Sequence, residues 1–185
     1  MFKTFLLSLL GLVLLAVLVV LGMAAMRPDD FSVLRSLRMA APPEKVFALV
    51  DDLKQFNRWN PWLKKDPTTQ LTYGPVTAGP GAQYAWTSEK MGAGSMTQAA
   101  ATAPAPGTAG RVAFKLDFLK PFETHNTAEF TFQPEGGTTT TVTWTMRGPM
   151  PFISKVMDVV VGMDSMIGPD FEAGLAELQK LAEQP

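Results

Sequence analysis

Apolar and polar residues alternate with a period of two along five consecutive segments of the chain. These segments are 82–88, 94–102, 111–118, 125–132 and 138–146. Such alternation places successive side chains on opposite faces of a β-strand. Glycine- and proline-containing turns separate the segments, at 79–81, 91–94, 104–110 and 134–137. The pattern predicts an antiparallel meander with one apolar face over a core and one polar face in water.

Shorter elements precede the meander. Imperfect alternation over residues 31–39 predicts a first strand. Pro43 suits the first turn of a helix, where its missing N–H costs no hydrogen bond, and an apolar stripe follows it over 43–51. A second short helix is expected around 53–57, and Pro61 breaks the chain soon after it.

Helical spacing returns after the meander. Apolar residues three and four positions apart continue from Val156 to Leu181 and predict a long C-terminal helical element. Gly168-Pro169 is expected to kink or divide this element, with Asp170 as a cap for its second part. The apolar face of the sheet needs such a helix as its partner. The Ala/Pro/Thr stretch 99–110 is expected to be a loop within the same domain.

The N-terminal segment is apolar throughout. Residues 5–26 contain no charge, and a helix of 22 residues reaches about 33 Å, enough to span a hydrocarbon core of roughly 30 Å. We therefore divide the chain into an anchor, residues 1–27, and one domain, residues 28–185. The alternative is a cleaved signal peptide, which Lys3 and the small residues before Met26 would suit. The apolar run is longer than the usual signal core of about 7–15 residues.

The direction of insertion follows from two opposing features. Arg27, Arg35 and Arg38 favour a cytoplasmic location for the residues after the anchor. A very short tail before a long domain favours export of that domain. We expect a single-pass membrane protein whose domain is extracytoplasmic, in the periplasm.

Composition narrows the function. With 16 Lys+Arg and 17 Asp+Glu, the chain lacks the basic footprint of a nucleic-acid binder. It contains no cysteine and one histidine, which excludes thiolate chemistry and any multi-histidine metal site, so we expect no metal and no cofactor. His125 falls on the polar face of its strand, where it would meet solvent. Asp117 and Glu123 show no spacing that suggests acid/base work.

A set of inward-facing side chains is expected to line an apolar cavity or, alternatively, to fill a core. The candidates are Trp59, Trp62, Tyr84, Trp86, Met96, Gln98, Phe114, Phe118, Asn126, Phe130, Trp144 and Met146 from the first part of the domain and the sheet, and Met157, Met163 and Met166 from the helical element opposite. Methionine adapts its shape to varied apolar ligands. Ala100 is expected on the same inward face as Met96 and Gln98.

Individual candidates permit two interpretations. Trp59 and Trp62 either gate the cavity mouth or pack the two short helices onto the sheet. Tyr84, Gln98 and Asn126 are polar and face inward, so each needs a hydrogen-bond partner, which is either a ligand or another group of the protein or an ordered water.

Three stretches resemble the START-like, or SRPBCC, superfamily, and in particular its polyketide cyclase/dehydrase-like branch. They are APPEKVFALVDDLKQFNRWNPW at 41–62, GGTTTTVTWTMRG ending at Gly148, and GPDFEAGLAELQKLAE at 168–183. The resemblance implies an α+β helix-grip fold, in which a curved antiparallel sheet wraps around a long C-terminal helix and two short helices follow the first strand. It also implies an internal cavity for apolar molecules.

Three functions follow as hypotheses. The first is a membrane-anchored protein that binds a hydrophobic or lipid-like small molecule without transforming it. The second is a cyclase- or hydratase-type enzyme acting on an apolar carbonyl compound, for which Tyr84 is the one titratable group predicted inside the cavity. The third is an accessory protein of a membrane complex. Because the same scaffold serves many activities, the resemblance identifies the fold and leaves the activity open.

Overall fold

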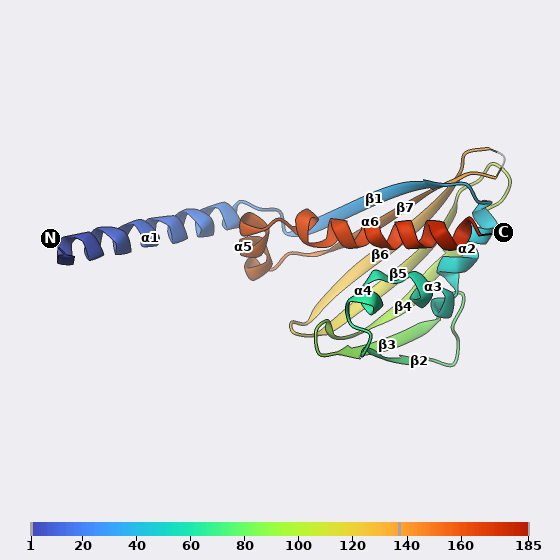
Figure 1. The fold of residues 1–185 in the computed structure, drawn as a ribbon, viewed down its shortest axis with the longest axis horizontal. Coiled ribbons are helices and arrows are strands. Elements are labelled where there is room, and N and C mark those ends of the chain that lie inside the picture. The colour runs from blue at the N-terminus through green and yellow to red at the C-terminus, as the bar shows by residue number, and fades with distance from the viewer. Residues whose placement is uncertain (1, 137, 185) are drawn as a thin grey trace.

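A computed structural model describes residues 2–136 and 138–184. Helix α1 (Phe2–Ala25) projects from a domain formed by the residues that follow it, as Figure 1 shows. Among the described residues, α1 is the one helix long and apolar enough to cross a membrane. It is exposed along nearly its whole length, and only Ala24, near its end, is fully buried.

One antiparallel sheet of seven strands forms the domain's framework, in the order β1-β7-β6-β5-β4-β3-β2. The strands are β1 (Asp30–Met39), β2 (Gln70–Tyr73), β3 (Gln83–Ser88), β4 (Gly92–Thr102), β5 (Gly110–Lys120), β6 (Thr124–Pro134) and β7 (Thr140–Pro149). The alternation pattern predicts six of them. It misses β2, because four residues at a sheet edge are too few to establish a period.

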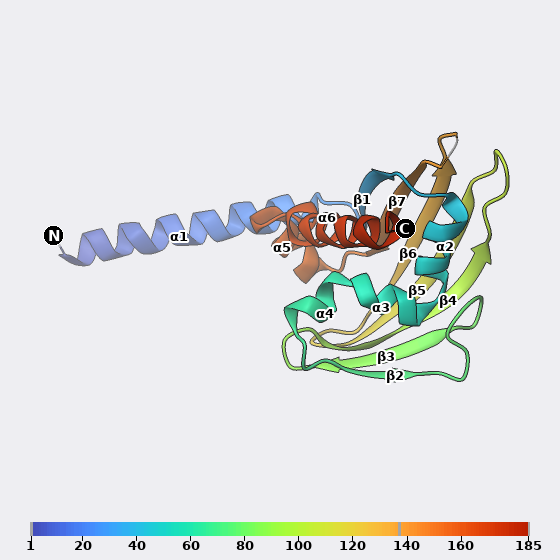
Figure 2. The same cartoon turned by 45° about the vertical axis from the view of Figure 1, so that its right-hand side comes forward.

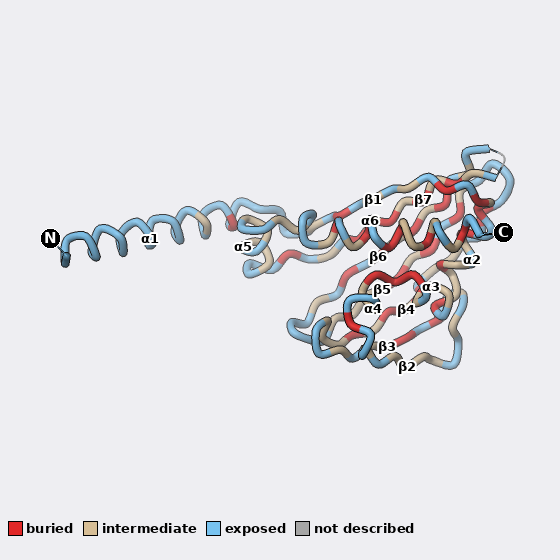
Figure 3. Tube along the Cα trace, in the orientation of Figure 1, coloured by how far each residue is buried: buried red, intermediate tan, exposed pale blue. Residues whose placement is uncertain are grey.

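The two faces of the sheet differ as the pattern predicts. Along β6, Asn126, Ala128, Phe130 and Phe132 are buried, and the residues between them are exposed or half-buried. Figure 3 shows the same alternation of buried and exposed positions along the neighbouring strands. The predicted turn at 134–137 includes Gly137, which lies outside the described residues.

A bulge in β4 corrects one predicted side-chain direction. The register with β5 shifts between Gln98 and Ala100, so that Ala100 lies opposite Ala113. Ala101, rather than Ala100, packs against the core. The extra residue inverts the alternation, as expected of a β-bulge. Since β4 continues to Thr102, the predicted loop over 99–110 is also shorter, with its first part inside the sheet.

Three short helices follow β1. Helix α2 (Pro43–Asp51) begins at a proline as predicted, and α3 (Leu53–Trp59) follows it directly. Helix α4 (Pro61–Lys65) is not predicted from the sequence, where Pro61 indicates only a break. Pro61 ends α3 but also starts α4, and the Asn60 side chain caps the new helix by accepting a hydrogen bond from the Trp62 N–H at 3.1 Å.

The C-terminal element divides at a different place from the one predicted. Helix α5 (Phe152–Val160) ends before Gly162, whose φ of 88° is strained for other residues, and α6 (Met163–Ala182) begins immediately afterwards. Pro169 lies inside α6 on its exposed side, where water can satisfy the carbonyl group that loses its partner. Asp170 is therefore not a helix cap.

Helix α6 runs beside β1 and β7 and packs closely against the sheet over its C-terminal part (Figure 2). Phe171 stacks on Trp144 of β7, with 4.0 Å between ring centroids and an angle of 5° between the planes. Arg35 of β1 donates hydrogen bonds to Glu172 at 2.6 Å and to Asp164 at 2.8 Å. The helix-grip fold is confirmed by this sheet, the short helices after β1 and the long helix that the sheet surrounds.

Gly174 sets how closely α6 approaches the sheet, and we predict that Gly174→Leu lowers the free energy of unfolding by about 1–3 kcal/mol. A Cβ at this position would lie 2.9 Å from the Trp144 ring and 3.1 Å from Pro61. The cost of overpacking exceeds the roughly 1 kcal/mol gained by replacing a helical glycine. Thermal unfolding of the detergent-solubilised full chain, followed by tryptophan fluorescence, measures the change.

Ala173→Leu is the matched control, because Ala173 is the exposed neighbour of Gly174 on the same helix. The control should unfold at the wild-type temperature. Equal stabilities of the two variants would contradict a close contact at Gly174.

Candidate functional site

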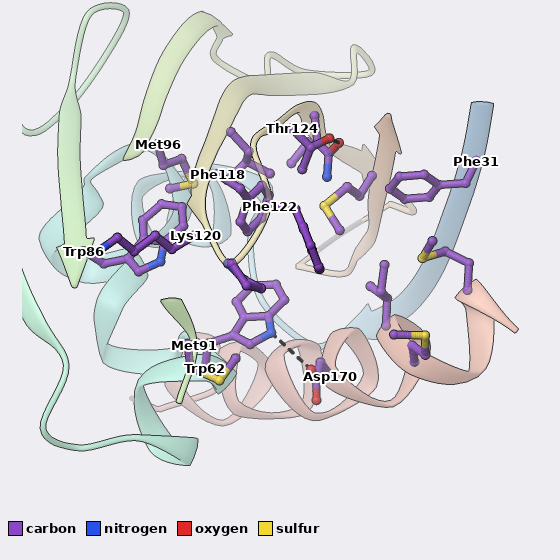
Figure 4. Close-up of a pocket in the computed structure, with 18 of the residues that line it drawn as sticks. Phe31, Trp62, Trp86, Met91, Met96, Phe118, Lys120, Phe122, Thr124 and Asp170 are labelled. Atoms are coloured by element: carbon purple, nitrogen blue, oxygen red, sulfur yellow. Dashed lines mark hydrogen bonds between the residues drawn. The ribbon is translucent and has the colours of Figure 1, made fainter. Parts of the chain in front are cut away.

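A cavity of about 480 Å³ lies between the apolar face of the sheet and the helices α4, α5 and α6. Its volume is within the range of roughly 300–1,000 Å³ typical of small-molecule sites. Figure 4 shows Trp86, Met96 and Phe118 facing the interior from the sheet side, with Trp62 and Asp170 on the helical side. Carbon atoms and thioether sulfur form most of this wall, so the space suits an apolar ligand.

Most of the residues predicted to line a cavity do line it. They are Trp62, Tyr84, Trp86, Met96, Phe118, Asn126, Phe130, Trp144, Met146, Met157, Met163 and Met166. They come from strands β3 to β7 and helices α4 to α6, and the sheet brings their inward positions together. Whether each contacts a ligand stays a prediction.

Trp59, Gln98 and Phe114 do not line the cavity, which corrects the prediction. The Trp59 ring packs edge-on against Phe130 and Trp144, and its Nε1 donates to the Leu49 carbonyl at 2.9 Å. This contact confirms the packing interpretation for Trp59. All three residues lie toward the end of the sheet that α2 and α3 cover, where side chains fill the interior.

Phe114 and Gln98 are held in this core in different ways. Phe114 packs beneath Phe56 at 6.0 Å between ring centroids. Gln98 donates to Asp51 at 2.6 Å through its Nε2, while its Oε1 has no hydrogen-bond partner among the described residues. Inward alternation alone cannot distinguish this packed end of the sheet from the cavity end.

Trp62 connects the cavity wall to α6. Its Nε1 donates to the Asp170 carboxylate at 3.1 Å, and Lys65 forms an ion pair with the same carboxylate. The Trp62 ring contacts Trp144 and Phe171 edge-on, at 5.6 and 6.3 Å between centroids. The tryptophan therefore both packs α4 onto the core and faces the cavity. Sequence reasoning missed Asp170 as a lining residue because it assigned this aspartate to a helix cap.

Tyr84 and Asn126, two polar side chains inside the cavity, are neutral hydrogen-bonding groups. Burial raises the pKa of Tyr84 well above its ordinary value, so its phenol stays neutral and is unsuited to act as a base. Asn60 donates to the Tyr84 hydroxyl at 3.5 Å, the limit of a hydrogen bond. Asn126 accepts weakly from Thr124 at 3.4 Å. Tyr84 and Asn126 thus each have a weak internal hydrogen bond, and whether either also orients a ligand stays a prediction.

Apart from Met157 and Met166, which are predicted candidates, no pattern in the sequence indicates the residues that form the mouth of the cavity. The lining residues that are exposed are Lys120, Pro121, Phe122, Glu123, Pro149, Pro151, Ile153, Met157 and Met166. Apart from the two methionines, they lie in the β5–β6 turn, the β7–α5 connection and the first turn of α5. Turns carry no periodic pattern, and only the fold brings these segments together.

His125 is exposed, as predicted, and lies outside the cavity. The antiparallel register places Asp117 opposite it, and the His125 Nδ1 lies 2.6 Å from the aspartate carboxylate. Glu123 is 3.9 Å from the other ring nitrogen. Linear spacing does not reveal these contacts, because the cross-strand register of β5 and β6 brings Asp117 and His125 together. Within residues 2–136 and 138–184, no three His, Asp or Glu side chains form a metal-binding group.

The fold and the cavity together define a helix-grip protein with an internal apolar site. Residues 30–183 match the family described as polyketide cyclase / dehydrase and lipid transport, and the chain belongs to this family. No curated protein matches the chain by sequence.

Several solved structures share the fold at low sequence identity. A hypothetical protein from Helicobacter pylori is 8% identical with a TM-score of 0.63, over 84% of this chain and 89% of that one. Truncated norcoclaurine synthase from Thalictrum flavum is 12% identical with a TM-score of 0.59, over 84% and 95% of the two chains. A Thermobifida fusca protein is 19% identical with a TM-score of 0.55, over 83% and 97%. These similarities establish the fold alone.

Asp66 stabilises the segment between α4 and β2, which forms part of the cavity wall. Its carboxylate accepts hydrogen bonds from the Ser88 hydroxyl at 2.5 Å and from the Thr68 hydroxyl at 2.6 Å. These bonds lower the pKa of Asp66 to about 2. Since Leu63, Thr69 and Leu71 line the cavity, Asp66 supports the site without entering it.

A lowered pKa in the folded state predicts a specific pH dependence. The contribution of Asp66 to stability is complete above the unfolded pKa, near 4, and is lost as the pH falls toward 2. Asp66→Asn should therefore lower the unfolding temperature at pH 6, and this difference from wild type should shrink between pH 4 and pH 2. Glu89→Gln, which removes an exposed carboxylate beside Ser88, is the control. A difference that does not change with pH would contradict this role of Asp66.

Proposed function

We propose that this protein is a membrane-anchored binding protein that holds a hydrophobic or lipid-like small molecule in the cavity. The observation that carries the proposal is a largely apolar cavity of about 480 Å³, open at one mouth, between the helices and the sheet. Burial of apolar ligand surface, worth roughly 25 cal/mol per Å², would supply the affinity. Membership of a family described by polyketide cyclase / dehydrase and lipid transport is consistent with this class of ligand.

Four titratable side chains line the cavity, and Lys120 and Glu123 are exposed at its mouth. The two that lie further inside, Tyr84 and Asp170, favour binding over carbonyl chemistry. Tyr84 is held neutral by burial, and Asp170 is already engaged by Trp62 and Lys65. A cyclase or hydratase needs a group that can take or give a proton at the reacting atom. Both residues are better placed to orient a ligand than to transfer its protons.

Contacts at the end of α1 support its retention as an anchor. Ala24 is fully buried, and Arg27, just after the helix, forms an ion pair with Asp158 of α5 at 3.2 Å. Lys155 of α5 pairs with Asp29 at 2.6 Å. A segment that is cleaved at Ala24 or Ala25 would lose the first of these contacts. An extracytoplasmic location of the domain is part of the proposal.

Retention of α1 predicts the mass of the mature protein. The protein isolated from membranes should show an intact mass near 20.1 kDa and should remain in the membrane fraction after an alkaline carbonate wash. A shorter chain beginning after Ala25, found in the soluble fraction, would show that α1 is a signal sequence.

Ligand occupancy is tested by native mass spectrometry of the full chain in detergent. The wild-type protein should carry an adduct whose mass fits a lipid-like molecule. Ala128→Phe, at a buried position that lines the cavity, should reduce the adduct by about tenfold, equivalent to ~1.4 kcal/mol. The added ring occupies the ligand's space.

Ala85→Phe is the matched control, because it is the same substitution at an exposed position of β3. It should retain the adduct. An adduct absent from the wild type, or lost equally in both variants, would contradict binding in the cavity. Near-ultraviolet circular dichroism checks that both variants are folded.

A further inference from the structure

Large exposed apolar side chains of the domain are concentrated at one end. Outside α1, the exposed large hydrophobic residues are Met26, Leu34, Val76, Leu119, Phe122, Phe152, Ile153, Met157, Val160, Val161 and Met166. All except Leu34 and Val76 lie just after α1, in α5 and the start of α6, or around the β5–β6 turn. These elements lie toward α1 in both views of the fold (Figures 1 and 2). An exposed apolar patch of this kind marks an interaction surface.

Helix α5 presents its apolar side outward. None of its nine residues is buried, and Ile153, Met157 and Val160, spaced four and three apart, are exposed. Its charged residues Lys155 and Asp158 turn instead toward Asp29 and Arg27, where they form ion pairs. A helix that meets water shows the opposite arrangement, whereas a helix lying in a membrane interface shows this one.

The same ion pairs hold α5 beside the C-terminal end of the anchor α1. Arg27 and Asp29 follow within four residues of Ala25, the last residue of α1. If α1 spans a bilayer, its C-terminal end lies at the membrane surface, and α5 lies there with it. The β5–β6 turn, with Phe122 at 68% exposure, lies on the same side of the domain.

These apolar segments are also the mouth of the cavity. Phe122, Ile153, Met157 and Met166 are both exposed to the outside and part of the cavity wall. Apart from Lys120 and Glu123 at the β5–β6 turn, the exposed lining side chains are apolar, and such a mouth is poorly suited to face water. It is well suited to face acyl chains, because a ligand could then enter without crossing a polar layer.

We propose that α5 and the β5–β6 turn form a lipid-facing rim, through which the cavity opens into the same bilayer that holds α1. The rim consists of Leu119, Phe122, Ile153, Met157, Val160 and Val161, and its partner is the interfacial layer of phospholipid acyl chains. The inference rests on the proposed function for the anchor and for the cavity ligand. It adds the surface that contacts lipid and the direction from which the ligand enters.

Single cysteines test the rim, because the natural chain contains none. The full chain is labelled with an environment-sensitive nitrobenzoxadiazole dye at Phe122→Cys, Ile153→Cys or Val160→Cys and reconstituted into phosphatidylcholine vesicles. Val76→Cys and Leu34→Cys are the controls, since these residues are apolar and similarly exposed, at 47% and 50%, outside the rim. The rim labels should show blue-shifted emission and a several-fold loss of emission when the lipid carries a nitroxide on its acyl chain.

Labels at the rim that are quenched no more than those at Val76 and Leu34 would overturn the proposal. A second variant examines the cause of the contact. With the dye at Ile153→Cys, the added changes Phe122→Asp and Val160→Asp should reduce quenching, because charges in the rim disfavour insertion. Unchanged quenching would contradict insertion through these side chains. Both positions are exposed, so the changes leave the core intact.

Failure of the rim and failure of the binding function give different results. Quenched rim labels in a protein that carries no adduct would support the rim and contradict ligand binding. An adduct in a protein whose rim labels are unquenched would support binding and overturn the rim. The dye measurement requires no ligand, so each result is interpretable by itself.

Discussion

The stacking of Phe171 on Trp144 is the contact on which the rest of the domain depends. One straight helix must cover the apolar face of a curved seven-stranded sheet, and it can approach that face closely over only part of its length. At the stack the two rings are 4.0 Å apart, and beyond it Leu175, Leu178 and Ala182 are fully packed. Toward its N-terminus α6 presents Met163, Met166 and Ile167 to open space. The cavity is the space that remains between the sheet and this part of α6.

Helix α5 covers the cavity at the end of the sheet that lies near α1, and this explains its position. At the far end of the sheet, α2 and α3 add Val46, Phe56 and Trp59 to the interior. At the end near α1 the corresponding cover is α5, which is turned with its apolar side outward and bound by its charged side to the residues after α1. In the proposed arrangement, lipid covers this apolar side. The anchor, the cavity mouth and the rim are in this account one arrangement for taking an apolar molecule from a bilayer.

The fold is predictable from the sequence because burial of one face of a strand or helix requires apolar residues at regular intervals. Alternation identified six strands, and Pro43 marked the start of α2. Errors occurred where one residue changed the geometry: the bulge after Gln98, the break at Gly162 in place of Gly168, and the second role of Pro61. For the site, inward alternation found Phe118 and Met146 but also Phe114, because the difference between them depends on which helix lies opposite. Phe122 and Ile153 lie where no period exists, so only the three-dimensional arrangement reveals them.

The central claim is that the space beneath α6 holds an apolar molecule. The most direct measurement is a high-resolution experimental structure of the full chain isolated from its native membrane, with attention to the region bordered by Trp62, Phe118 and Met146. The account predicts continuous elongated density, extending from Tyr84 toward Phe122 and unconnected to the protein. A cavity closed by rearranged side chains, or one occupied by a network of ordered water molecules, would contradict it.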